Sequence, residues 1–121
     1  MNIAVLNETS PGEARVALMP DSVQKLVAQK ASVSIESGAG LGAARTDDDY
    51  SAAGATVVDD RNGLLAQADV LVVVNRLSPE DFNRLQQGAV VLGFLRPLDE
   101  PAALIPALEN SLTTFAMELV P

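Results

Sequence analysis

The 121-residue sequence contains no cysteine and no histidine. Without thiols, the chain has no means to form disulfide bonds, thiol redox centres or zinc–thiolate sites. Without imidazole, it lacks the side chain whose unperturbed pKa lies closest to neutrality. A general base would have to be a carboxylate or a lysine with a strongly shifted pKa. These two absences argue against a self-contained enzyme and predict that the chain holds no catalytic residue and no metal.

Aromatic residues and basic residues are also scarce. Aromatic residues make up only 3% of a chain that is 48% hydrophobic, so an ordered aliphatic core is expected. Eight basic residues face sixteen acidic ones, which gives a net charge of -8. Such a surface repels phosphate backbones and anionic membranes, so nucleic acid is not an expected partner. In the simpler interpretation, the acidity only keeps the domain in solution.

Long apolar segments are missing as well. The longest uninterrupted apolar run, VLVVV, is far too short to span a bilayer. The N-terminus has no basic region followed by a long apolar stretch, so no signal peptide is indicated. The sequence therefore predicts a cytoplasmic location.

Short β-branched apolar runs alternate along the chain with segments of helical periodicity. Strands are predicted at 2–6, 32–37, 55–59, 69–74, 89–95 and 112–119. Helices are predicted at 20–30, 46–54, 61–68, 78–85 and 100–111, with Pro106 kinking or splitting the last. This alternation predicts an α/β fold in one domain, a three-layer α/β/α sandwich with a mostly parallel sheet. The expected architecture is Rossmann-like, in a flavodoxin-like variant.

The stretch GAGLGA at 38–43 fits the pattern G-x-G-x-x-A of dinucleotide-binding loops. It follows a strand, and Asp59 or Asp60 lies about where a ribose-binding acid would be expected. However, a true fingerprint leads directly into a helix whose N-terminus holds the pyrophosphate. Here three aspartates at 47–49 come first, and they would repel phosphate. We interpret the stretch as a glycine-rich turn and the aspartates as a solvated helix start rather than a metal site.

Arg15 is the first candidate for a binding residue. It lies on the loop after the first strand, and ligands of open α/β sheets bind beyond the C-terminal ends of the strands. A guanidinium in that position suits a carboxylate or a phosphate. The alternative is an ion pair with Glu8 or Glu13 that only rigidifies the loop.

Two further strand ends carry similar residues. Asn75 and Arg76 follow the predicted strand 69–74, and Arg96 follows the strand 89–95. Since the C-terminal ends of parallel strands meet at one edge, an electropositive rim for a substrate or anion is predicted there. The alternative is that loops after strands are simply polar.

At this point the sequence resembles a known family. The stretches ETSPGEARVALMPDSVQKL, VSIESGAG, YSAAGATVVD, ADVLVVV and FAMELVP occur in this order over the whole chain. They are similar to the N-terminal domain shared by alanine dehydrogenases and the alpha subunits of proton-translocating NAD(P) transhydrogenases. The pattern E-x-x-x-x-E-x-R-V-A and the stretch ESGAG are its most specific parts.

The resemblance distinguishes two branches. In alanine dehydrogenases, Arg15 would match the arginine that holds the substrate carboxylate. Those enzymes also need a lysine where this chain has Asn75, and a catalytic histidine where it has Arg96. The transhydrogenase alpha subunit lacks both groups, and FLRPLDEPAALIPALENSLTTFAMELVP is similar to it. The resemblance therefore implies the transhydrogenase branch.

In that branch, residues 1–121 would form a single N-terminal domain, followed beyond Pro121 by a Rossmann domain that this chain does not contain. The full protein would bind NAD(H) mainly through the later residues, and NADP(H) would lie on a partner domain. A membrane-embedded part would complete the complex at the cytoplasmic face, and the full protein would be a homodimer. The isolated chain is expected to be inactive and to bind NADH weakly or not at all.

Two other interpretations stay open. The chain could belong to an alanine dehydrogenase-like oxidoreductase acting on an amino or imino acid, with Arg15 as the carboxylate clamp. It could also be a non-catalytic α/β module that binds a partner or an anionic ligand.

Overall fold

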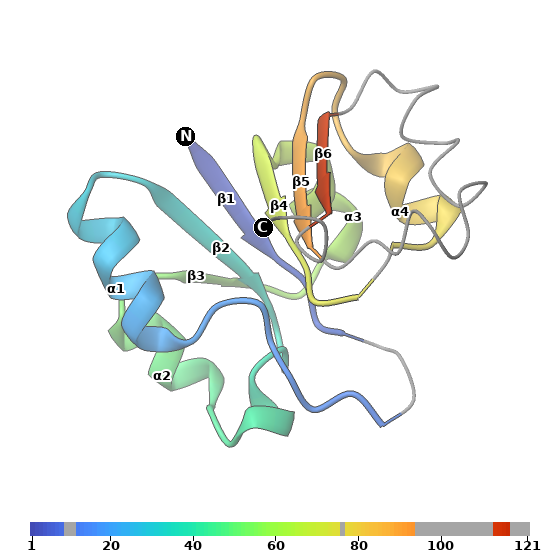
Figure 1. The fold of residues 1–121 in the computed structure, drawn as a ribbon. Helices are drawn as coiled ribbons and strands as arrows, with labels where there is room; N and C mark the ends of the chain where they lie inside the picture. Colours follow the sequence, from blue (N-terminus) through green and yellow to red (C-terminus); the bar gives the residue numbers. More distant parts are fainter. Residues whose placement is uncertain (9–11, 76, 94–112, 117–121) are drawn as a thin grey trace.

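The computed structural model describes residues 1–8, 12–75, 77–93 and 113–116 (Figure 1). The strands are β1 (Asn2–Val5), β2 (Ser32–Glu36), β3 (Thr56–Val58), β4 (Val70–Val72), β5 (Val90–Gly93) and β6 (Thr113–Ala116). The helices are α1 (Pro20–Ala28), α2 (Asp47–Ala52), α3 (Arg61–Gln67) and α4 (Pro79–Arg84), together with the 3-10 turn η1 (Leu41–Ala43). Every predicted element within these residues is present, and most are shorter than predicted.

All six strands form one parallel sheet in the order β3-β2-β1-β4-β5-β6. Strand β1 lies at its centre, where Ile3 pairs with Val33 of β2 on one side and Val70 of β4 on the other. This is the Rossmann order 3-2-1-4-5-6 rather than the flavodoxin order 2-1-3-4-5. The predicted α/β fold is confirmed, and its order places the topological switch point between β1 and β4.

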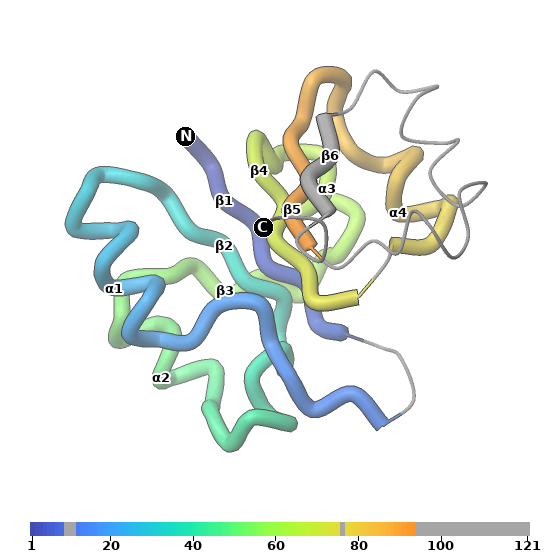
Figure 2. The backbone as a smooth tube through the Cα atoms, viewed as in Figure 1, coloured from blue at the N-terminus to red at the C-terminus, as the bar shows by residue number. Residues whose placement is uncertain are grey.

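The sheet is covered on both faces, which gives the three layers. Alternate residues of β1 point to opposite faces. Ile3 and Val5 join the core that contains Val23 of α1 and Tyr50 of α2. Ala4 and Leu6 instead join the core beneath α3 and α4. Figure 2 shows the corresponding arrangement of the backbone, with α1 and α2 on one side and α3 and α4 on the other.

The helix starts follow from local chemistry. Pro20 occupies the first turn of α1, where its missing N–H leaves no bond unmade. Thr46 and Asp49 form a capping box at α2, and the Ser78 hydroxyl accepts the backbone N–H of Asp81 at α4. These caps fix where each helix begins, and therefore where the preceding loops leave the sheet.

The C-terminal part is described only in its strand. The strand predicted at 112–119 is present as β6, and the predicted helix at 100–111, with its kink at Pro106, lies outside the described residues. Among the helices that the structure describes, none has both the length and the apolar character needed to cross a bilayer.

Candidate functional site

A cavity of about 410 Å³ opens at the C-terminal edge of the sheet, beside the switch point between β1 and β4. It is lined by the loop after β1 and by the ends of β4 and β5: Arg15, Val16, Ala17, Val72, Val73, Val74, Leu92 and Gly93. Its size is within the range of small-molecule sites, and its position is where open α/β sheets bind ligands. Arg15 is the one charged side chain among these lining residues.

Gly93 allows this end of the sheet to close tightly. A Cβ atom at Gly93 would lie 2.6 Å from both Cγ2 and the carbonyl oxygen of Val73. Any larger residue would therefore push β5 away from β4 at the floor of the cavity.

Glu8 joins the loop after β1 to the end of β4. Its two carboxylate oxygens accept the backbone N–H groups of Val74, at 2.9 Å, and Asn75, at 3.0 Å. Two consecutive amides pointing at one carboxylate make a small anion-binding arrangement. In this protein its occupant is one of the chain's own side chains.

Glu13 brings two of the predicted site residues together. Its carboxylate accepts from Nε and Nη2 of Arg15, at 3.0 and 2.9 Å, and from the backbone N–H of Arg15 at 2.9 Å. The Nδ2 of Asn75 donates to the same carboxylate at 2.7 Å. These hydrogen bonds from Arg15, followed by that from Asn75, lower the pKa of Glu13 to about 2.

The alternative role predicted for Arg15 was an ion pair with Glu8 or Glu13. The structure contains this ion pair, and the partner is Glu13. The hydrogen bonds that Arg15 donates to Glu13 raise the pKa of Arg15, and the charges of Glu13 and Glu8 add to the effect. Even so, the Arg15 side chain is 66% exposed, and it lines the cavity. A ligand role for Arg15 and Asn75 stays a prediction, while Arg76 and Arg96 lie outside the described residues.

A second arginine lies at the same edge of the sheet, and the sequence patterns do not single it out. Arg61, the first residue of α3, donates through Nε and Nη2 to both oxygens of Asp81, at 3.2 and 2.8 Å. Its Nη1 donates to Glu36 at 2.6 Å and to the carbonyl oxygen of Asn7 at 3.2 Å. The hydrogen bonds to Asp81, the largest cause, and the charges of both acids raise the pKa of Arg61.

This cluster ties β1, β2, α3 and α4 together, because Glu36 also accepts the backbone N–H of Asn7 at 2.8 Å. The only sequence signals for it are a glutamate closing a strand and an arginine opening a helix. Neither signal indicates the partners of Arg61, because Asp81 lies 20 residues and Glu36 lies 25 residues away from it in the sequence.

Two positions at the crevice of this Rossmann-type sheet bear on dinucleotide binding, the loop after the first strand and the end of the second strand. In that fold the loop after the first strand is glycine-rich, and an acid in the next strand region binds the ribose. Here Glu8, in the loop after β1, accepts the backbone N–H groups of Val74 and Asn75 at the end of β4. Glu36, at the end of β2, is already bound to Arg61.

The GAGLGA stretch is a turn, as interpreted from the sequence. It contains only the three-residue η1, too short to present a helix N-terminus to a phosphate. Two of its glycines, Gly40 and Gly42, allow close packing. A Cβ atom at Gly42 would lie 2.9 Å from the Cα and carbonyl oxygen of Ala14, and one at Gly40 would lie 2.5 Å from Cε2 of Tyr50. The loops after β1 and β2 are thereby held against each other.

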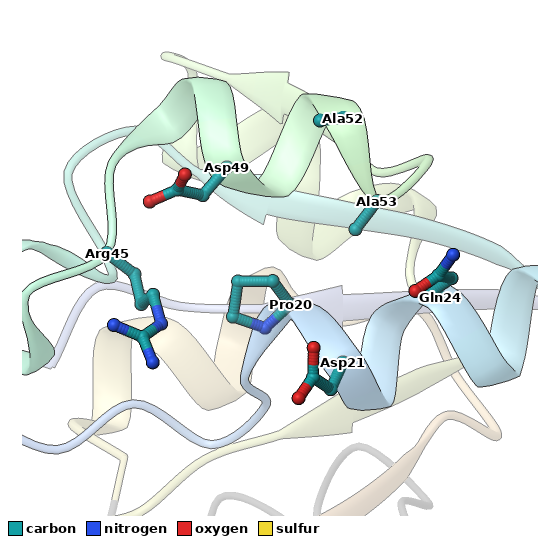
Figure 3. A pocket seen from close by; sticks show the side chains of 7 residues that line it. All are labelled: Pro20, Asp21, Gln24, Arg45, Asp49, Ala52 and Ala53. Atoms are coloured by element: carbon teal, nitrogen blue, oxygen red, sulfur yellow. The ribbon is translucent and has the colours of Figure 1, made fainter.

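A second hollow of about 390 Å³ lies between α1 and α2 (Figure 3). Figure 3 shows Arg45 at one end of the hollow, with Asp49 on the side of α2 and Asp21 on the side of α1. The two acids are explained by local structure, since Asp49 closes the capping box and Asp21 lies in the first turn of α1. Because ligands of open α/β sheets bind beyond the C-terminal ends of the strands, we take the crevice at the switch point as the candidate site.

The aspartates at 47–49 do not converge on a common point. Asp47 accepts the backbone N–H of Gly38 at 2.9 Å, and Asp49 accepts that of Thr46 at 2.8 Å. Within the ranges that the structure describes, no cluster of three or more acidic side chains is arranged to hold a metal ion.

The chain is similar in sequence to a known family and to several of its members. Residues 4–121 match the family model described as "Alanine dehydrogenase/PNT, N-terminal domain". The chain is 38% identical over 126 residues to an NAD(P) transhydrogenase subunit alpha polypeptide of Rhodospirillum rubrum, covering 100% of this chain and 33% of that polypeptide. It is 34% identical over 120 residues to alanine dehydrogenase of Mycobacterium tuberculosis, covering 99% of this chain and 32% of that protein.

The solved structures agree with the sequence relatives. A transhydrogenase from Sinorhizobium meliloti superposes with a TM-score of 0.94 at 36% identity, over 100% of this chain and 36% of that one. An L-alanine dehydrogenase superposes with a TM-score of 0.91 at 31% identity, over 98% and 32%. The chain thus spans about a third of the length of these relatives.

Proposed function

The chain belongs to the family of alanine dehydrogenase/PNT N-terminal domains, and we propose to which of the family's two branches the full protein belongs. We assign it as the N-terminal domain of the NAD(H)-binding alpha subunit of a proton-translocating NAD(P) transhydrogenase. The full protein would transfer hydride between NADH and NADP+. The runner-up is the N-terminal domain of an alanine dehydrogenase-like enzyme.

The observation that carries this choice is the contact between Glu13, Arg15 and Asn75. A dehydrogenase of this family would need a lysine at the position of Asn75 and a histidine at that of Arg96. The Asn75 side-chain amide does not ionise near neutral pH, and it donates to Glu13. The other described residues around the cavity are apolar except Arg15, which is permanently protonated. None of the side chains that line the cavity can therefore accept a proton from an amine.

The relatives support the same assignment at the level of the whole protein. We propose that a second, Rossmann-type domain follows residues 1–121 in the full-length polypeptide and carries most of the NAD(H) site. The occupied crevice in the present domain is consistent with this division, because Glu8 and Arg61 take up the groups that a dinucleotide would need. NADP(H) would then bind a partner domain, and the homodimeric complex would place this domain at the cytoplasmic face of a membrane.

The assignment is tested on the full-length protein assembled with its NADP(H)-binding and membrane-embedded partners. We expect NADH-dependent reduction of an NADP+ analogue, followed by absorbance, and no alanine-dependent reduction of NAD+ in the same preparation. A preparation that oxidises alanine without transferring hydride between the two nucleotides would favour the dehydrogenase branch instead.

A further inference from the structure

The loop after β1 is held near its start by two side chains from other elements of the fold. We propose that Glu36 is a positioning residue of the crevice at the switch point. Oriented by Arg61, it fixes the backbone of Asn7, which in turn directs Glu8 to the amides that follow β4. The inference goes beyond the proposed function, because it concerns the shape of the crevice and holds for either branch of the family. It can therefore be measured without hydride transfer.

The backbone of Asn7 is bound on both sides. Its N–H donates to Oε1 of Glu36 at 2.8 Å, and its carbonyl oxygen accepts from Nη1 of Arg61 at 3.2 Å. The same Nη1 donates to the same Oε1 at 2.6 Å. The three bonds close a ring around Asn7, so its N–H and its carbonyl group cannot turn without breaking a hydrogen bond to a charged partner.

Arg61 is held in turn from its other edge. Its Nε and Nη2 bind the two oxygens of Asp81, and its Nη1 is thereby directed at Glu36. A bidentate arginine–carboxylate pair of this kind fixes the plane of the guanidinium. The side chains of Asp81 and Glu36 are nearly buried, so water competes little for these bonds. The ring around Asn7 is therefore anchored to α3 and α4.

Asn7 transmits this anchoring to the crevice, because Glu8 is the next residue. The Glu8 carboxylate accepts the backbone N–H groups of Val74 and Asn75, which lie 66 and 67 residues further along the chain. The side chain of Asn75 then donates to Glu13. A rotation of the peptide between Asn7 and Glu8 would move the carboxylate away from these amides. The contacts that shape the crevice thus begin at the ring around Asn7.

The experiment measures hydrogen–deuterium exchange in the full-length protein, resolved to single amides by mass spectrometry with electron-transfer fragmentation. Glu36→Met keeps approximately the length of the side chain but removes both its charge and its acceptor oxygens. We expect the amides of Val74 and Asn75 to exchange about tenfold faster in this variant than in the wild type, because Glu8 no longer stays on them.

A destabilising variant elsewhere separates positioning from a general loss of stability. Val23→Ala leaves a cavity in the core beneath α1. The amide of Val73, which donates to β5 at 2.9 Å, reports the loss of overall stability in each variant. When the two variants are compared at equal exchange of Val73, the amides of Val74 and Asn75 should exchange faster in Glu36→Met.

Glu36→Gln should restore most of the lost protection, because its oxygen can still accept from the N–H of Asn7. If Glu36→Met does not fold, as judged by its melting curve, Glu36→Asp decides the question. It keeps the charge but is one methylene too short to reach Asn7, and it should speed exchange at the same two amides. Equal exchange of these amides in Glu36→Met and Val23→Ala, or no protection regained in Glu36→Gln, would overturn the inference. Absence of hydride transfer in the full-length protein would instead refute the proposed function.

Discussion

Two arginines at the same edge of the sheet differ in almost everything except their chemistry. Arg15 is 66% exposed and binds a glutamate two residues away in the same loop. Arg61 is 25% exposed and binds groups from the loop after β1, from β2 and from α4. The contact of Arg15 stabilises a local loop, whereas the contacts of Arg61 join elements that are distant from one another in the sequence. We infer that the Arg61 contacts hold the scaffold and the Arg15 contact tunes what the scaffold presents.

Burial is what separates the two roles. An exposed ion pair stays largely hydrated and contributes little to the free energy of unfolding. A buried one is costly to break, because the partner that remains keeps its charge without a counter-ion. The side chains of Asp81 and Glu36 are 8% and 13% exposed, so they cannot recover water if Arg61 is removed.

The largest effect is therefore expected for Arg61→Ala. It removes the principal counter-ion of two nearly buried carboxylates, Asp81 keeping only the 3.7 Å contact with Arg84, and should lower the free energy of unfolding by about 3 kcal/mol. Urea unfolding followed by circular dichroism measures this change. A loss no larger than that of Arg15→Ala would remove the distinction between the two arginines.

An intermediate effect is expected for Glu36→Gln. The side-chain oxygen of glutamine can still accept from the backbone N–H of Asn7 and from Arg61, now without the charge that strengthens both bonds. We expect a loss of about 1 kcal/mol in the same urea experiment. A loss as large as that of Arg61→Ala would mean that Glu36, rather than Asp81, is the principal partner of Arg61.

The same contrast explains what can be predicted from sequence. Apolar runs, Pro20, Thr46 and Ser78 are local signals, and they place the described helices and strands correctly. Because strand and helix alternate, the parallel sheet follows too. The strand order does not, since nothing in a local pattern distinguishes the Rossmann order from that of a flavodoxin.

The site is predictable to the same extent. The position of Arg15 after the first strand is enough to place it at the switch point, and Glu13 lies near enough in sequence to be one of two expected partners. The contacts of Glu8 and Asn75 across 67 residues, and of Arg61 with Asp81, depend on how the sheet assembles. Long-range polar contacts of this kind have no periodic signature in the sequence.

The smallest effect on stability is expected for Arg15→Ala, which should keep the fold and lower the melting temperature less than Arg61→Ala does. Its sharper readout is the pKa of Glu13, which Arg15 holds at about 2 instead of its ordinary 4.5. A carboxylate with a lowered pKa stabilises the folded state above pH 4.5, and this contribution disappears as the pH falls toward 2.

In the variant, the pKa of Glu13 should rise toward 4.5, because the side-chain hydrogen bonds of Arg15 are the largest cause of the shift. Carbon-13 NMR of the Glu13 carboxyl group, titrated from about pH 6 to about pH 3, follows this directly. The wild-type group should stay ionised throughout, whereas that of the variant should titrate. Arg84→Ala is the control, since Arg84 contacts Asp81 and not Glu13. An unchanged Glu13 titration in Arg15→Ala would mean that Asn75 and the backbone hold the carboxylate, leaving the guanidinium free for a ligand.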